Sequence, residues 1–99
     1  MRSFKVPRIG PDEFVDVMRR KLAAKEFDRY VILDLNGDSL VVELRWMGTT
    51  RFDYRIEPTD DGFCAELVGQ RVATLHAAFS DRFEGYFEDA LSKVGATAI

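Results

Sequence analysis

The sequence has little of what most catalytic, metal-binding and secreted domains depend on. It holds one cysteine, Cys64, and one histidine, His76, in 99 residues. A single cysteine excludes an internal disulfide, and the first ten residues lack the apolar core of a signal peptide. Glycine-rich phosphate loops, CxxC pairs and HxxxH pairs are also missing from the sequence. We therefore expect a cytoplasmic, non-enzymatic chain that carries no cofactor or metal.

Long apolar runs and a strong net charge are missing too. The uncharged apolar stretches are only a few residues long, so the sequence predicts no membrane-spanning segment. The formal net charge is −3 at pH 7, which argues against general nucleic-acid binding. With 46% hydrophobic and 31% charged residues, we expect a single α+β domain over residues 1–99.

The order of apolar patterns along the chain predicts an α+β fold. A short strand near Phe4 precedes a helix over 11–27, which Pro11 and two acidic residues begin. Apolar residues at helical spacing between Val72 and Gly95 predict a long C-terminal helix, in which Ser80 could cap a second segment. Between the helices, alternating patterns predict strands at 29–36, 39–47, 50–57 and 63–68.

Short connections between these strands, such as Asn36-Gly37, favour antiparallel hairpins. We therefore expect a two-layer sandwich. Its antiparallel sheet consists of the short N-terminal strand and a four-strand meander. Both helices cover one face of that sheet, because the stripe of the C-terminal helix is too apolar to face water.

This order of elements resembles that of small helix-grip-like domains. It is also similar to that of short bacterial proteins associated with polyhydroxyalkanoate granules, including a Leu67-Val68-Gly69 stretch before the last helix. A helix-grip-like arrangement implies a small apolar ligand between the long helix and the sheet. Because neither resemblance rests on a diagnostic motif, we assign no family.

The segment ELRWMGTTRFDYRIE, residues 43–57, alternates aromatic with charged residues and could be a nucleic-acid platform or a hairpin. If Trp46 lies opposite Phe52, then Arg45 lies opposite Asp53, and the charged pairs on the outer face are complementary. This register predicts aromatic residues in the core and arginines on the other face. A sheet that stacks bases needs both on one exposed face, so we expect a structural hairpin.

The neighbouring hairpins can be paired by the same reasoning. In the hairpin around 58–63, Arg55 is expected opposite Glu66, which again joins opposite charges. Around Asn36-Gly37, Leu33 is expected opposite Leu40. A shift of two residues would keep the same faces in that hairpin, so its register is less fixed.

Three sets of residues are candidates for function, and the outer sheet face is the first. Its partly apolar character favours a surface for a protein partner or a second copy of the chain, as a homodimer; it comprises Tyr30, Ile32, Val41 and Met47. Charged helix surfaces could assist docking, since residues 1–30 carry eight basic and five acidic residues and the other 69 carry six and twelve; the candidates are Arg19, Arg20, Lys25, Glu84 and Glu88. An apolar pocket under the long helix is the alternative to plain core packing; it would use Trp46, Tyr54, Phe79 and Phe83.

Three further features have simpler structural interpretations. His76 lies at the flank of the helical stripe, and nothing in the sequence places Cys64 beside it, so we expect no catalytic pair. Asp60 and Asp61 with Glu57 lack the ligand spacing of a calcium loop, so we expect a solvated turn.

Overall fold

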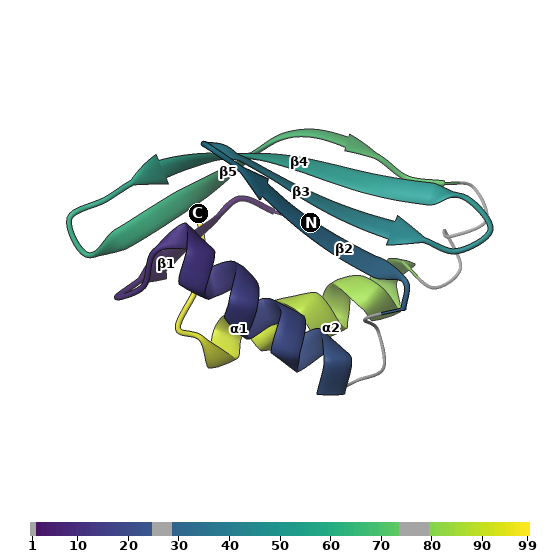
Figure 1. The fold of residues 1–99 in the computed structure, drawn as a ribbon, viewed down its shortest axis with the longest axis horizontal. Helices are drawn as coiled ribbons and strands as arrows, with labels where there is room; N and C mark the ends of the chain where they lie inside the picture. The colour runs from purple at the N-terminus through teal and green to yellow at the C-terminus, as the bar shows by residue number, and fades with distance from the viewer. Residues whose placement is uncertain (1, 25–28, 74–79) are drawn as a thin grey trace.

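The computed structural model describes residues 2–24, 29–73 and 80–99. These residues form two helices and a six-stranded antiparallel sheet, which confirms the predicted α+β class (Figure 1). The elements in chain order are β1 (Phe4–Pro7), α1 (Pro11–Ala24), β2 (Val31–Asn36), β3 (Ser39–Arg45), β4 (Thr49–Pro58), β5 (Gly62–Arg71), α2 (Ser80–Lys93) and β6 (Thr97–Ala98).

The strand order in the sheet is β2-β3-β4-β5-β1-β6. The N-terminal strand β1 therefore lies between β5 and β6, and β6 was not predicted from the sequence. The backbone N–H of Ile99 donates to the carbonyl of Ser3 at 3.1 Å, which holds the two ends of the chain together. In Figure 1 both helices lie on the same side of the sheet.

One hydrophobic core lies between the helices and the sheet. Alternate residues of the strands β1 to β5 enter it, as in β4, where Phe52, Tyr54 and Ile56 are buried and the residues between them are not. Phe14 of α1 packs edge-on against Phe63 of β5, with ring centroids 5.3 Å apart. Tertiary packing of this kind, more than helix propensity, stabilises short elements.

The first helix begins as the sequence predicts. Pro11 occupies its first position, and Asp12 and Glu13 lie in the first turn, where the helix dipole favours acidic side chains. The buried residues are spaced for one face, namely Phe14, Val15, Met18 and Leu22. The helix is described as far as Ala24, and the predicted end near residue 27 lies outside the described residues.

The C-terminal helix is shorter than predicted. Strand β5 continues through Gly69 to Arg71, so the expected boundary at Gly69 is wrong. The register shifts between Asp53 and Tyr54, and this bulge lets Gly69 pair with Asp53 while β5 stays beside β4. Val72 follows the strand and belongs to no helix, whereas α2 begins at Ser80, the residue named as an N-cap.

The register predicted for β3 and β4 is wrong by four residues. Glu43 lies opposite Arg51, and Val42 lies opposite Phe52. Because a shift of four residues keeps every side chain on its face, the hydrophobic pattern could not separate the two registers. The turn decides between them, since Met47 and Gly48 both adopt positive φ, at 51° and 133°. The hairpin therefore closes directly after β3.

Trp46 consequently does not lie in the core, where the sequence predicts it. It precedes this turn and is 44% exposed, so its predicted place opposite Phe52 is wrong. The pairing of β2 with β3 is also shifted, by two residues, because Leu33 lies opposite Val42 and not Leu40. In contrast, the pairing of β4 with β5 is confirmed, with Arg55 opposite Glu66.

Candidate functional site

The residues proposed as a partner surface lie on β2, on β3 and at the turn that follows β3. Tyr30, Ile32 and Met47 are exposed by 37%, 39% and 71%, and Val41 is half-buried. The N–H of Arg45 donates to the carbonyl of Tyr30 at 2.7 Å, which extends the β2–β3 pairing to the residue before β2. Ile32 and Val41 then share the outer face of two adjacent strands.

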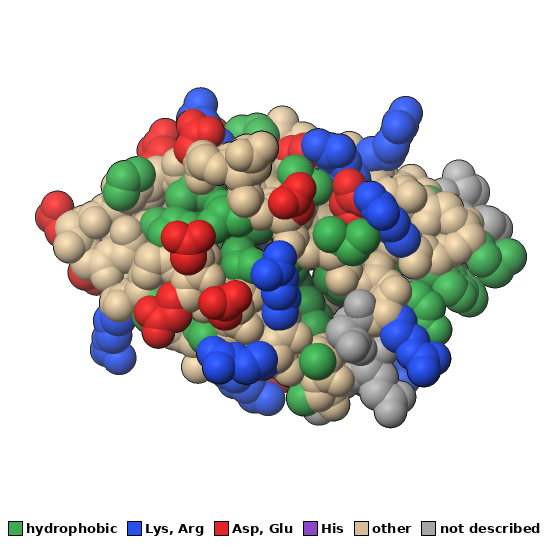
Figure 2. Space-filling model, in the orientation of Figure 1, with side chains coloured by type: hydrophobic (Ala, Val, Ile, Leu, Met, Phe, Trp, Pro, Cys, Tyr) green, Lys and Arg blue, Asp and Glu red, His purple; other side chains and the backbone are tan. Residues whose placement is uncertain are grey.

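Exposed apolar side chains also gather at one end of the sheet, around the β3–β4 turn. Trp46 and Met47 belong to this turn, and Val72 follows the neighbouring strand β5 with 47% exposure. The backbone N–H of Ala73 donates to the hydroxyl of Thr50 at 3.0 Å, which brings the end of β5 beside the turn. Figure 2 shows hydrophobic side chains at this right-hand end of the molecule. The sequence missed this end because the turn was placed two residues too late.

The middle of the outer face carries a network of ion pairs. Arg45 contacts Glu43 at 2.6 Å, Arg51 contacts Asp53 at 2.9 Å, and Arg55 contacts Glu66 at 2.7 Å. Each guanidinium donates a side-chain hydrogen bond, Arg51 to Asp53 and Arg55 to Glu66, and this bond raises the pKa of both arginines. These guanidinium groups already have carboxylate partners, and apolar side chains lie at the margins of the network.

The charged docking candidates divide between the two helices. Arg19 of α1 donates from Nη2 to the carbonyl of Leu33 at 2.6 Å, and its Nη1 lies 4.0 Å from Asp16. Arg20 is exposed on the same helix, and Lys25 lies outside the described residues. On α2, Glu84 is half-buried and Glu88 is exposed. The structure therefore brings Arg19 to β2 but does not bring the basic and acidic candidates together.

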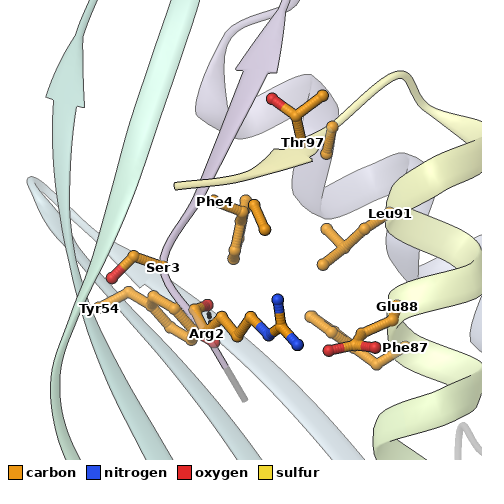
Figure 3. A pocket seen from close by; sticks show the side chains of 10 residues that line it. Arg2, Ser3, Phe4, Tyr54, Phe87, Glu88, Leu91 and Thr97 are labelled. Carbon is orange, nitrogen blue, oxygen red and sulfur yellow. Dashed lines mark hydrogen bonds between the residues drawn. The ribbon is translucent and has the colours of Figure 1, made fainter.

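A small cavity lies at the other end of the core, and Tyr54 is the member of the predicted pocket that lines it. The cavity measures ≈ 210 Å³ and is bounded by β1, β4, α2 and β6. The Tyr54 hydroxyl donates to the carbonyl of Arg2 at 3.1 Å. The Arg2 side chain extends toward Glu88 (Figure 3). Burial raises the pKa of Tyr54, and the negative charges of Glu84 and Glu88 raise it further.

The other predicted pocket residues do not surround this cavity. Phe83 is buried and packs against Phe87, with ring centroids 6.0 Å apart. Trp46 is at the exposed turn, and Phe79 lies outside the described residues. The pocket expected between the helix and the sheet is therefore not assembled from the residues that the sequence suggested.

Two hollows that the sequence did not suggest lie along the seam between α1 and β2. The larger measures ≈ 470 Å³, and its lining includes Arg19, Arg20 and Val31. The smaller measures ≈ 210 Å³, and its lining includes Asp16, Asp34 and also Arg19. Both hollows lie beside β2, which is at the edge of the sheet in the strand order.

The remaining candidates do not form a chemical site in the described part of the chain. Cys64 is a free, half-buried thiol between Lys5 and Glu57 on adjacent strands, and His76 is not among the described residues. Asp61 accepts a hydrogen bond from the Thr59 hydroxyl at 3.4 Å within the β4–β5 turn.

Within residues 2–24, 29–73 and 80–99, no group of three or more His, Cys, Asp or Glu side chains is placed to hold a metal ion. The helices in these ranges are too short and too polar to cross a bilayer. Comparison with known proteins identified no matching family model, no similar curated protein and no similar solved structure.

Proposed function

We propose that the protein is a non-enzymatic interaction module of the cytoplasm that binds a protein partner or a second copy of itself. Binding would use the outer sheet face around Tyr30, Ile32, Val41 and Met47, with charged side chains of the helices assisting. The observation that carries this proposal is the exposure of Tyr30, Ile32 and Met47 together on adjoining elements. Exposed apolar residues that adjoin one another are typical of interaction surfaces.

The arrangement of the helices supports this choice of face. We infer a two-layer sandwich in which α1 and α2 cover the inner face and leave the outer face to solvent. The ion pairs of Arg45, Arg51 and Arg55 would then lie beside the apolar residues and add polar contacts to the surface. Protein interfaces combine apolar and polar contacts in this way.

Binding of a small apolar ligand is the second candidate function. The cavity beside Tyr54 favours it, because Phe4, Phe87 and Leu91 provide an apolar lining. Its volume of ≈ 210 Å³ is below the roughly 300–1,000 Å³ of typical ligand pockets, so only a small molecule would fit. A rise in melting temperature with short-chain fatty acids or small aromatic compounds, lost in Leu91→Trp, would favour this candidate over the first.

The outer face can be tested with two charge substitutions and a matched control. Ile32→Glu and Val41→Glu each place a carboxylate on the proposed face, whereas Ile99→Glu changes a 71% exposed residue beside β6, at the far side of the sheet. Purified proteins would be compared by light scattering and by chemical cross-linking to proteins of the source cell. We expect the two face variants to lose self-association or one identified cross-linked partner, and the control to keep it. A strictly monomeric protein whose cross-links are unchanged by both face variants would refute the proposal.

A further inference from the structure

The outward edge of β2 has a specific backbone pattern. Because Tyr30 and Arg45 form a hydrogen-bonded pair, the antiparallel alternation makes Ile32 and Asp34 the next residues that bond to β3. The N–H and C=O groups of Val31 and Leu33 therefore point away from the sheet. In the described part of the chain, β2 has a strand neighbour on one side only. Such an edge is a template for pairing with another strand.

The contact made by Arg19 supports this orientation independently. Its guanidinium Nη2 donates to the carbonyl of Leu33 at 2.6 Å, from a helix outside the sheet. The Leu33 carbonyl must therefore face outward, and a donor already occupies it. A charged side chain that covers an edge is one way in which proteins restrain uncontrolled strand pairing. Strand addition here would have to displace this one contact.

The charges along the edge are arranged with opposite signs at its two ends. Helix α1 and strand β2 run in opposite directions (Figure 1). Arg19 lines both hollows, but three acidic residues, Asp12, Asp16 and Asp34, surround it at the end near Leu35, whereas Arg20 joins it at the end near Val31. A two-fold axis between two copies would place the acidic end of each against the basic end of the other. An interface that uses the same surface on both copies requires this self-complementarity.

We propose that this edge binds the same edge of a second copy, through antiparallel pairing of the two β2 strands. The proposal rests on the self-association proposed above, but it places the contact at the backbone edge of β2 and not on the outer face around Val41. The axis passes through Leu33, which faces Leu33 of the second copy. Val31 then lies opposite Leu35 of the second copy, so the inner face of the joint is apolar.

Other registers of this pairing are less favourable. An axis at Asp34 places two aspartates directly opposite, and like charges in that position are destabilising. An axis at Ile32 shortens the overlap of the two strands and brings the Arg20 side chains toward each other. With the axis at Leu33, Ile32 lies opposite Asp34 of the second copy, and Arg19 at the axis gives up the Leu33 carbonyl to a backbone donor. The two sheets become one continuous sheet.

A charge exchange on α1 tests the predicted polarity of the dimer. Asp16 and Arg20 are both exposed, so Asp16→Arg and Arg20→Asp leave the core unchanged. Each single variant should raise the dimer dissociation constant by roughly tenfold, because two ion pairs per dimer become like-charge contacts. A mixture of the two variants should form heterodimers, since each chain then meets opposite charges at both ends. Equal association of the wild type, both variants and the mixture would overturn the proposal.

A cysteine pair tests the register in the same protein, with Cys64→Ser as background. Ile32→Cys with Asp34→Cys places thiols opposite each other at a non-hydrogen-bonded position, where Cα atoms are about 4.5 Å apart and a disulfide can form. We expect the double variant to be a covalent dimer on non-reducing gels, with Ile32→Cys alone and Val41→Cys alone remaining unlinked. Cross-linking of Ile32→Cys alone, or a monomeric wild type at high concentration, would overturn the proposal. Proposed binding to another protein would survive that monomeric result if Val41→Glu abolished a cross-link to that protein.

Discussion

The close approach of β1 to β5 at Gly62 gives the sharpest stability prediction. Gly62 lies opposite Pro7 in the sheet, and a methyl group at its Cα would lie 1.9 Å from the carbonyl oxygen of Val6 and 2.9 Å from the Cα of Pro7. Both neighbours are backbone atoms, so no side-chain rotation can relieve the contact. Gly62→Ala must therefore separate β1 from β5 locally. The neighbouring hydrogen bond from the N–H of Arg8 to the carbonyl of Asp61 would be disturbed as well.

The loss of stability expected for Gly62→Ala can be estimated from substitutions that place extra atoms in a well-packed protein interior. Such substitutions destabilise by about 1–3 kcal/mol, and we expect the upper part of that range because backbone must move. For a chain of this size, each kcal/mol lowers the melting temperature by about 4–8 °C, so a fall of roughly 10–20 °C is expected for Gly62→Ala. The measurements are urea unfolding followed by circular dichroism and a calorimetric melting scan.

Gly85 provides the matched control for this substitution. It lies within α2, and a methyl group there would meet no atom within 4 Å. Gly85→Ala should stabilise the protein by up to about 1 kcal/mol, because alanine has the higher helix propensity. If Gly62→Ala unfolds at the same urea concentration as the wild type, the pairing of Pro7 with Gly62 is wrong and the placement of β1 must be revised.

Two further predictions concern named side-chain contacts. Because burial raises the pKa of Tyr54, the folded state keeps its phenolic proton more tightly than the unfolded state, whose ordinary pKa is 10.0. The contribution of this group to the free energy of unfolding is fully present below that pH and is lost as the pH rises above it. The urea midpoint of the wild type should therefore drop more between pH 8 and pH 11 than that of Tyr54→Phe. Equal drops in the two proteins would contradict this. Arg55 and Glu66 form an exposed pair at 2.7 Å, and a double-mutant cycle with alanine should give a small favourable coupling that shrinks in 1 M salt. A coupling unchanged by salt would contradict an ionic origin.

The hairpins show how far cross-strand pairing can be predicted from residues alone. The β4–β5 register was predicted correctly because Arg55 and Glu66 offer a charge match in the same alignment that pairs Ile56 with Ala65. In the β3–β4 hairpin, two registers four residues apart both match Glu43 with an arginine. Cross-strand charges are worth less than 1 kcal/mol, so they could not choose between them. The positive φ of Met47 and Gly48 in the turn determines the register instead.

The C-terminal half shows a limit of periodicity. Residues after Gly69 fit a helical spacing in sequence, yet Gln70 and Arg71 continue β5 opposite Phe52 and Arg51. The neighbouring strand β4 supplies backbone hydrogen bonds to these residues, and the spacing of apolar residues within one segment cannot predict such bonds. The bulge near Asp53 lets β4 and β5 pair as far as Arg51 and Arg71, beyond the end of the predicted hairpin. The backbone N–H of Ala73 then donates to the hydroxyl of Thr50.

The proposed interface depends on which strand lies at the edge of the sheet, and no single segment of the sequence determines that. The N-terminal strand could have paired with β2, and then Val31 and Leu33 would have had strand neighbours on both sides. It pairs with β5 and β6 instead, with Phe4 opposite Ala65 and Ala98. That choice leaves β2 at the margin, beside the helix that carries Asp16 and Arg20. In the proposed dimer, Arg20 of α1 would meet the acidic end of the same edge on a second copy, a contact that cannot form within one chain.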